Sequence, residues 1–259
     1  RRWGAAGRRL ASAFRYVSAA DARTGETLSA LRGQSVPVLG NLKLAAPAPK
    51  VDARARAALA EEIGARPLWL AASTHEGEDE IILAAHEKLR AAHPGALLII
   101  APRHPDRGAA IAARAKGAPR RAAFEPIGAA DVYVADTLGE MGVLYDLAPI
   151  ALIAGSLLPH LKGHNPIEPA KLGAAILSGP HVESFEEVFA ALFSVNGARA
   201  VRDADEIAAA VGALWSDESR AQALREAARA IVGQGGAALN DTGARLLALA
   251  PQPGAEPAH

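Results

Sequence analysis

Short apolar runs alternate with alanine-rich segments along most of the chain, and this alternation constrains the fold more than any other feature of the sequence. The runs are apolar at every position, which is typical of parallel strands whose two faces are both covered by helices. They fall at 36–40, 67–73, 96–102, 131–137, 150–156 and 174–180. The sequence therefore predicts an α/β fold built on a doubly wound parallel sheet.

Helices are predicted between these runs and after the last of them, because the intervening segments are rich in alanine. The expected helices are 52–64, 78–92, 106–116, 139–147, 165–172, 184–194 and 203–232. Asp52 is the expected N-cap of the first of these, and Asp106 that of the third, since aspartate side chains accept hydrogen bonds from the first backbone N–H groups of a helix.

The composition excludes several classes of protein and site. The chain of 259 residues contains no cysteine, so it has neither a disulfide framework nor a thiolate metal site. With 28 basic and 28 acidic residues it is not a generally basic nucleic-acid binder, and no nucleic-acid partner is expected. No stretch reaches the roughly 20 consecutive apolar residues of a membrane span.

The sequence predicts one main domain with short flanking segments. Residues 1–45 are predicted to be the end of a preceding domain together with a linker, residues 46–250 the main α/β domain, and residues 251–259 a disordered tail. Because the sequence starts without a methionine or a signal peptide, we expect a fragment of a longer protein.

Doubly wound sheets bind ligands beyond the carboxyl ends of their strands, so the loops after the strands carry the functional predictions. The loop after 96–102 contains Arg103, whose guanidinium suits a carboxylate, a phosphate or a base edge, although a solvated cationic loop fits equally well. The loop after 67–73 contains Ser73 as a candidate phosphate ligand. It also contains His75, for which local hydrogen bonding is favoured over a role as general base.

Two glycines follow the strand predicted at 131–137. Gly139 and Gly142 stand where this strand passes into a helix, so that backbone N–H groups could face an anion without obstruction by a Cβ. A tight turn would need the same glycines. Since neither a GxGxxG nor a Walker lysine motif is present, the spacing leaves both interpretations open.

The segment GSLLPHLKGHNPIEPA, residues 155–170, places several reactive side chains directly after an apolar run. His160, His164 and Glu168 are spaced by four as on a metal-binding helix, but Gly163 and Pro166 make a continuous helix unfavourable. A helix with Asn165 as N-cap and Pro166 as its first residue fits better. Glu168 would then lie in the first turn, where it could accept hydrogen bonds from a ribose diol.

Several of these motifs together resemble one enzyme family. The segments GNLK, ASTHEGE, APRHPDRG, DTLGEMGVLYDLAPIALIAGS and GHNPIEPAKLGAAILSGPH, in this order, are similar to those of the 3-deoxy-D-manno-octulosonic acid (Kdo) transferases. The resemblance covers nearly the whole chain. It implies a GT-B glycosyltransferase fold of two Rossmann-like domains, of which this chain supplies the carboxyl-terminal one and lacks most of the amino-terminal one.

The resemblance also implies which residues bind the donor, CMP-Kdo. Lys43 resembles the family's cationic stabiliser of the transition state, although an ordinary linker lysine remains the alternative. The residues expected to contact the donor are Ser73, Pro102, Arg103, Leu138, Gly139, Glu140, Met141, Gly142, Asn165, Pro166, Ile167 and Glu168. Relatives commonly have Gly-Gly-His-Asn where this chain has Lys162-Gly163-His164-Asn165, which leaves the geometry of that loop open.

The implied activity is inverting transfer of Kdo from CMP-Kdo to a lipid A precursor in lipopolysaccharide biosynthesis. It would occur on the cytoplasmic face of the bacterial inner membrane. The family's acceptor groove, membrane anchor and carboxylate general base belong to the amino-terminal domain, so this chain is expected to bind the donor and to transfer nothing by itself. Neither a cofactor nor a metal is expected. The alternatives are another GT-B nucleotide-sugar transferase or epimerase, and an inactive nucleotide-binding module.

Overall fold

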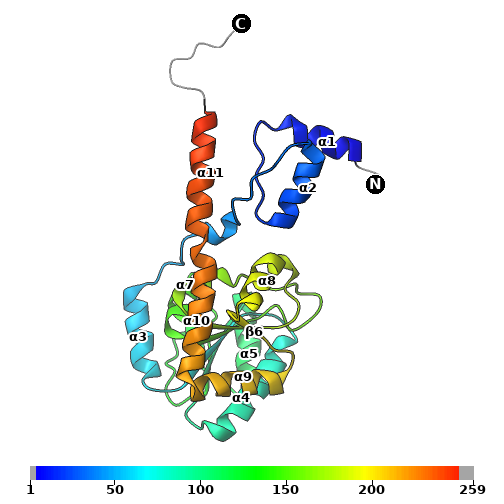
Figure 1. Cartoon of the computed structure of the whole chain (residues 1–259). Helices are drawn as coiled ribbons and strands as arrows, with labels where there is room; N and C mark the ends of the chain where they lie inside the picture. Colours follow the sequence, from blue (N-terminus) through cyan, green and yellow to red (C-terminus); the bar gives the residue numbers. More distant parts are fainter. Residues whose placement is uncertain (1–3, 251–259) are drawn as a thin grey trace. The chain divides into compact units, whose positions relative to one another are not determined.

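The computed structural model describes residues 4–250 and divides the chain into two compact units (Figure 1). One unit is formed by the residues up to Pro47 together with those from Val232 onward, and the other by Ala48–Ile231. The tail predicted at 251–259 lies outside the described residues. Each unit is described separately below.

The larger unit is built on a six-stranded sheet in the order β3-β2-β1-β4-β5-β6, in which every neighbouring pair is parallel. The strands are β1 Leu68–Thr74, β2 Leu97–Pro102, β3 Val132–Val134, β4 Ile150–Ile153, β5 Ala175–Ser178 and β6 Ala198–Ala200. The prediction of a doubly wound parallel sheet is therefore confirmed. The strands β2 to β5 lie within the predicted runs, β1 extends one residue beyond its run to Thr74, and the three-residue β6 was not predicted.

The helices of this unit mostly coincide with the predicted ones. They are α3 Ala53–Ile63, α4 Glu78–Ala92, α5 Gly108–Arg114, α6 Met141–Leu147, α7 Ile167–Leu172, α8 Glu186–Ser194 and α9 Ala204–Ser216, with α10 Glu218–Gly233 running into the other unit. Asp52 caps α3 as predicted and accepts a hydrogen bond from the Ala55 backbone N–H at 2.8 Å.

Two helix predictions were wrong in detail. The segment predicted as one helix over 203–232 breaks at Asp217, whose carboxylate accepts a hydrogen bond from the backbone N–H of Arg220 and thereby favours a new helix start. Asp106 does not cap a helix. It lies inside the short 3-10 helix Pro105–Arg107, and the residue at the N-cap of α5 is Arg107.

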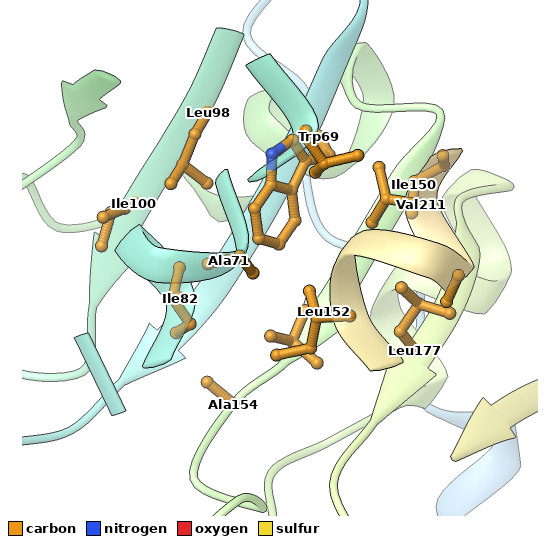
Figure 2. Close-up of a cluster of buried hydrophobic side chains, with 14 of the residues drawn as sticks. Trp69, Ala71, Ile82, Leu98, Ile100, Ile150, Leu152, Ala154, Leu177 and Val211 are labelled. Atoms are coloured by element: carbon orange, nitrogen blue, oxygen red, sulfur yellow. The ribbon is translucent and has the colours of Figure 1, made fainter. Parts of the chain in front are cut away.

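Both faces of the sheet are buried, which explains why the strand sequences do not alternate between apolar and polar residues. On one face Trp69, Leu98 and Leu152 pack against residues of α4, α5 and α9, including Ile82 and Val211 (Figure 2). The residues pointing to the opposite face are equally buried, and Leu70, Ile99 and Ile153 are all 0% exposed. Burial of such aliphatic side chains stabilises the fold by roughly 1.5–3 kcal/mol each.

The smaller unit contains α1 Gly4–Ala13, α2 Ala22–Arg32, the 3-10 helix η1 Leu42–Ala45 and α11 Gly235–Leu249. The strand predicted at 36–40 is wrong. Val38 forms only an isolated bridge with Ala19, and Pro37 has no N–H to donate to a ladder. The helix α11 was not predicted; it packs against η1 at Gly235, where a Cβ would lie 2.2 Å from the Leu44 carbonyl carbon.

The order of the strands reverses between β1 and β4. From β1 the chain builds outward through β2 to β3, and from β4 it builds outward through β5 to β6 on the other side. Loops on the two sides of such a switch point diverge and leave a crevice at the carboxyl ends of the strands, where doubly wound proteins bind their ligands. Among residues 4–250, no helix is both long enough and apolar enough to cross a membrane.

Candidate functional site

One buried carboxylate joins the two sides of the switch point. Glu78, the first residue of α4, is 0% exposed and accepts four backbone hydrogen bonds. Its Oε2 accepts from His75 at 3.0 Å and from Gly155 at 2.7 Å, and its Oε1 accepts from Ser156 and Leu157, each at 3.0 Å. The loop after β4 is thereby attached to the start of α4, which rigidifies the floor of the crevice.

A second buried carboxylate attaches the loop after β2. Asp79 is 0% exposed and forms an ion pair with Arg107, whose Nη1 also donates to the Thr74 carbonyl oxygen at 3.1 Å. The backbone N–H of Arg103 donates to the same carbonyl at 3.0 Å. Arg103 is therefore placed at the switch point through its backbone, while its side chain is exposed.

Three histidine rings from three loops meet above these carboxylates. The Nε2 atoms of His75 and His164 lie 2.7 Å apart, and the two rings are stacked with their centroids 5.0 Å apart. The ring of His104 meets that of His75 edge-on at a centroid distance of 5.9 Å. We call these three residues the histidine cluster.

The histidine cluster disfavours positive charge on its own rings. Burial, together with charge repulsion from His75, Arg103 and His104, lowers the pKa of His164 to about 4. Burial also lowers the pKa of His75, against the opposing effect of the Glu78 carboxylate. Without a ligand, both rings are therefore neutral at pH 7.

The loop after β3 is held by two further ion pairs. The Arg121 guanidinium donates to both oxygens of Glu140, with Nη2 at 2.7 Å from Oε1, and Thr137 Oγ1 donates to Oε2. The hydrogen bond from Arg121 is the main reason that the pKa of Glu140 is lowered. Arg120 pairs with the buried Asp136 through one oxygen, with Nη2 at 2.7 Å and Nε at 2.8 Å from Oδ2.

A cavity of about 510 Å³ lies beside this loop and is lined by Arg121, Phe124, Tyr133, Thr137 and Glu140 among others. It opens at the carboxyl end of β3, which is the end of the sheet where the residues predicted to bind the nucleotide lie. A second cavity of about 610 Å³ lies beside the amino end of β3 instead, and its lining contains none of the predicted site residues.

The segment that carries Glu168 differs slightly from the prediction. The helix α7 begins at Ile167, and the residue at its N-cap is Pro166, not Asn165. Asn165 still acts on the helix start, because its Oδ1 accepts a hydrogen bond from the Ile167 backbone N–H at 2.9 Å and its Nδ2 donates to Glu168 Oε1 at 3.3 Å. The Glu168 carboxylate is partly exposed and available to a ligand.

The helices α6 and α7 pack against each other and bring two predicted segments together. Tyr145 of α6 is buried, which raises its pKa, and the negative charge of Glu168 on α7 raises it further.

Gly142, predicted to face an anion, also has a packing role, since a Cβ there would lie 2.1 Å from the Lys50 carbonyl oxygen. Gly139 has φ of 83° with no atom near a Cβ, so only its backbone conformation requires glycine.

The predicted site residues of the larger unit all follow the carboxyl ends of strands or stand at them. Pro102 ends β2, Leu138 is 80% exposed after β3, and Ser73 forms a bulge in β1 with φ of 61°. Lys43 belongs to the smaller unit, in η1. Among residues 4–250, no group of three or more His, Cys, Asp or Glu side chains is arranged to hold a metal ion.

Sequence reasoning missed the residues that organise the site. The roles of Glu78 and Arg121 were not predicted, and neither was the contact of His75 with His164. For Glu78, His75 and His164 the available signal was their position, because polar residues that follow buried strands meet the neighbouring loops at the same edge of the sheet. Arg121 precedes β3 and gave no such signal.

Comparison with known proteins finds similarity to 3-deoxy-D-manno-octulosonic acid transferases. The chain is 42% identical over 162 residues to the 3-deoxy-D-manno-octulosonic acid transferase of Haemophilus influenzae, a match that covers 60% of this chain and 38% of the relative. It is 36% identical over 232 residues to that of Bordetella pertussis, covering 85% of this chain and 53% of the relative. The chain thus spans about half or less of the length of these curated relatives. No protein-family model matches the chain.

Solved structures agree with this result. The C-terminal CMP-Kdo binding domain of WaaA from Acinetobacter baumannii superposes with a TM-score of 0.61 and 26% identity, over 72% of this chain and 96% of that domain. Anabaena Alr3699/HepE, solved with UDP-glucose, matches with a TM-score of 0.55 at 13% identity over 95% of this chain and 67% of its own, which bears on the fold alone. These comparisons confirm the predicted resemblance to the carboxyl-terminal part of the Kdo transferases and the predicted GT-B, Rossmann-like fold.

Proposed function

We propose that this relative of the Kdo transferases is the donor-binding part of such an enzyme and that residues 46–250 bind CMP-Kdo. The observation that carries the proposal is its similarity to the WaaA CMP-Kdo binding domain, of which 96% is covered. The whole enzyme would transfer Kdo with inversion to a lipid A precursor in lipopolysaccharide core biosynthesis.

The geometry of the crevice supports this proposal. A sugar nucleotide presents a base, a ribose, a phosphate and here a sugar acid, and each needs a different neighbour. The exposed Arg103 guanidinium suits the cytosine edge or an anion, and the partly exposed Glu168 carboxylate suits the ribose diol. The remaining proposed contacts are Ser73, Pro102, Leu138, Gly139, Glu140, Met141, Gly142, Asn165, Pro166 and Ile167.

The phosphate is proposed to lie near the start of α6. Leu138, Gly139 and Met141 offer backbone groups there, and the Glu140 side chain is turned to Arg121 and Thr137. Because Arg121 neutralises the carboxylate, Glu140 does not repel the phosphate. The backbone of this segment would face the ligand, and the Glu140 side chain faces Arg121 and Thr137. This arrangement explains how an acidic residue fits into an anion site.

The chemistry of transfer needs more than this crevice. We propose that Lys43 stabilises the charge that develops on the leaving phosphate. The general base that deprotonates the acceptor hydroxyl, the acceptor groove and the contact with the membrane are assigned to the amino-terminal domain, of which residues 1–45 would be the end. The whole enzyme would then act at the cytoplasmic face of the inner membrane.

Calorimetric titration of the 259-residue chain with CMP tests the proposal, with UMP and UDP-GlcNAc as controls. We expect CMP to bind in preference to both, and binding to weaken about tenfold or more in Arg103→Ala and Glu168→Ala, as expected for the loss of a charged hydrogen bond. Preference for UDP-GlcNAc would indicate a different nucleotide-sugar enzyme. If neither substitution weakens the affinity for CMP, the nucleotide binds outside the proposed crevice. Kdo transfer by the 259-residue chain alone would refute the assignment of the base to another domain.

A further inference from the structure

The histidine cluster is not used by the proposed function, although it lies at the switch point. His75 follows β1, His104 follows β2 and His164 belongs to the loop after β4, so the three rings connect loops from both halves of the sheet. His164 also stands directly before Asn165, the first residue of the segment proposed to bind the ribose. The position of the His164 ring therefore bears directly on that segment.

One hydrogen bond joins the rings of His75 and His164 end to end. Their Nε2 atoms lie 2.7 Å apart, and their ring planes are within 12° of parallel. The centroid distance of 5.0 Å is close to the sum of this contact and the two ring radii, so the Nε2–H of one ring points at the Nε2 lone pair of the other. Because each neutral ring has one donor and one acceptor nitrogen, the bond needs no additional proton.

His75 is the more firmly placed member of this pair. Its backbone N–H donates to the buried Glu78 carboxylate at 3.0 Å, which fixes the chain beneath the ring. The ring of His104 meets the His75 ring edge-on, at a centroid distance of 5.9 Å and an angle of 83° between the planes. Both the backbone and the ring of His75 therefore have partners of their own, and His164 bonds to a ring that is already oriented.

The loop after β4 is shaped to leave room for the His164 ring. Gly155 has φ of 70°, and a Cβ there would lie 2.4 Å from Cδ2 of His164, so the ring occupies the space that a side chain would fill. The Gly163 backbone N–H donates to the Gly155 carbonyl oxygen at 2.7 Å and closes the loop directly before the ring. The ring is therefore fixed between this loop and His75, and its position determines where the chain enters Asn165.

A short series of contacts leads from His164 to the carboxylate proposed to bind the ribose. Asn165 is the next residue in the chain; its Oδ1 accepts from the Ile167 backbone N–H at 2.9 Å, and its Nδ2 donates to Glu168 Oε1 at 3.3 Å. The helix α7 that carries Glu168 has only six residues. The segment that precedes this short helix therefore contributes to the orientation of the Glu168 carboxylate.

We infer that His75 is a positioning residue of the nucleotide site. Through its hydrogen bond to His164 it positions Asn165, and with Asn165 the Glu168 carboxylate, in the orientation that a ribose diol requires. The inference rests on the proposed function, in which Glu168 binds the ribose. The property that His75 controls is the selectivity for a nucleotide with 2′ and 3′ hydroxyl groups over one that lacks them.

Calorimetric titration with CMP and with 2′,3′-dideoxy-CMP measures this selectivity, because the second nucleotide lacks the diol. The wild-type 259-residue chain should bind CMP about tenfold more tightly than the dideoxy nucleotide, and Glu168→Ala should bind both alike. His75→Asn has an amide that reaches only the level of Nδ1. It should lower the preference for CMP to about threefold or less and leave the affinity for the dideoxy nucleotide within about twofold of the wild type.

Three further variants separate positioning from a general effect on the fold. His75→Gln has an amide at the level of Nε2 and should restore most of the preference for CMP; if it behaves as His75→Asn does, the hydrogen bond is not what positions the segment. His160→Asn, at an exposed histidine of the loop that carries His164, should keep the wild-type preference. Because His75 acts through Glu168, the double variant His75→Asn/Glu168→Ala should bind CMP no more weakly than Glu168→Ala alone.

The possible failures are distinguishable. If Glu168→Ala loses the preference for CMP and His75→Asn keeps it, or if the losses add in the double variant, the inference is overturned and the proposed function stands. If the wild type binds neither nucleotide, or binds both alike, Glu168 does not bind the ribose and both proposals fail. His164→Asn repeats the test from the other end of the hydrogen bond. Loss of both nucleotides in His75→Asn and in His164→Asn would overturn the inference, because the pair would then support the fold of the whole pocket.

Discussion

The Glu78 carboxylate lies between two backbone segments that are 80 residues apart in sequence, and it accepts hydrogen bonds from His75 and Gly155 through the same oxygen. The contact attaches the loop after β4 to the start of α4 and so positions the residues of that loop that are predicted to bind CMP-Kdo.

Glu78→Gln should destabilise the chain substantially, although the two side chains have nearly the same shape. The amide nitrogen would face backbone N–H groups that now donate to an oxygen, so two donors would lose their acceptor. We expect a loss of about 3 kcal/mol in the free energy of unfolding, measured by urea denaturation. Glu80→Gln, on the exposed face of the same helix turn, should change it by less than about 0.5 kcal/mol. Equal effects of the two substitutions would contradict the structural role of Glu78.

Gly155→Ala tests whether the loop was built around the His164 ring. Gly155 and Gly128 both have positive φ, of 70° and 53°, but only at Gly155 would a Cβ collide with another side chain. Gly128→Ala should cost about 1 kcal/mol from backbone strain alone. Gly155→Ala should cost about 1–3 kcal/mol more through overpacking. Thermal unfolding of the two variants checks the difference, and identical losses would mean that His164 is free to move away.

The buried His86 should make the fold sensitive to acid. Trp69 Nε1 donates to its Nδ1 at 3.1 Å and its Nε2 lies 2.8 Å from the Asp131 carbonyl oxygen, so the ring is neutral with its proton on Nε2. Burial lowers the pKa of His86 to about 4. The unfolded chain therefore binds a proton here below pH 6.5 and the folded chain does not.

The corresponding stability is complete above pH 6.5 and is lost as the pH falls from 6.5 toward 4. We expect this residue to account for a loss of about 3 kcal/mol over that range. Urea denaturation at pH 7 and pH 4.5 measures it. The pH dependence should be shallower in His86→Gln and unchanged in His160→Gln. If the free energy of unfolding of His86→Gln depends on pH as steeply as that of the wild type, the acid sensitivity belongs to other groups.

Arg121→Ala should weaken CMP binding without touching the nucleotide directly. Removal of the guanidinium leaves Glu140 with Thr137 as its partner and restores an uncompensated negative charge beside the proposed phosphate position. We expect CMP affinity to fall about tenfold by calorimetry. Arg202→Ala, which removes an arginine from an exposed ion pair with Glu206, should leave the affinity unchanged. If Arg121→Ala binds CMP as the wild type does, the phosphate lies elsewhere.

The sequence was sufficient to predict the parallel sheet, because each strand from β1 to β5 is a continuous apolar run buried on both faces. It failed at 36–40, where Val36-Pro37-Val38 has the composition of a strand but forms only a bridge with Ala19. The short β6 was missed because Ala198–Ala200 contains Arg199 and has no apolar run. Tertiary contacts, not local preference, decide such short edge segments.

The candidate site was predictable as a set of loops but not as a set of contacts. That Arg103, Glu140 and Glu168 follow strand ends could be read from the sequence. That His75 meets His164 depends on strand order, since β1 and β4 are neighbours although β2 and β3 come between them in the chain. That Arg121 pairs with Glu140 depends on the path of the segment before β3, which forms an isolated bridge from Arg120 to Val134 near the carboxyl end of that strand. Periodicity carries no information on that order.

The central claim is that a cytidine nucleotide binds at the carboxyl ends of the strands, and backbone amide NMR during a CMP titration tests it most directly. We expect shifts that gather at Arg103, at residues 138–142 and at Asn165, Ile167 and Glu168, and that leave the cavity beside the amino end of β3 unaffected. Shifts that gather instead at Leu83, Arg90, Lys116 and Asp131, which line that other cavity, would contradict it.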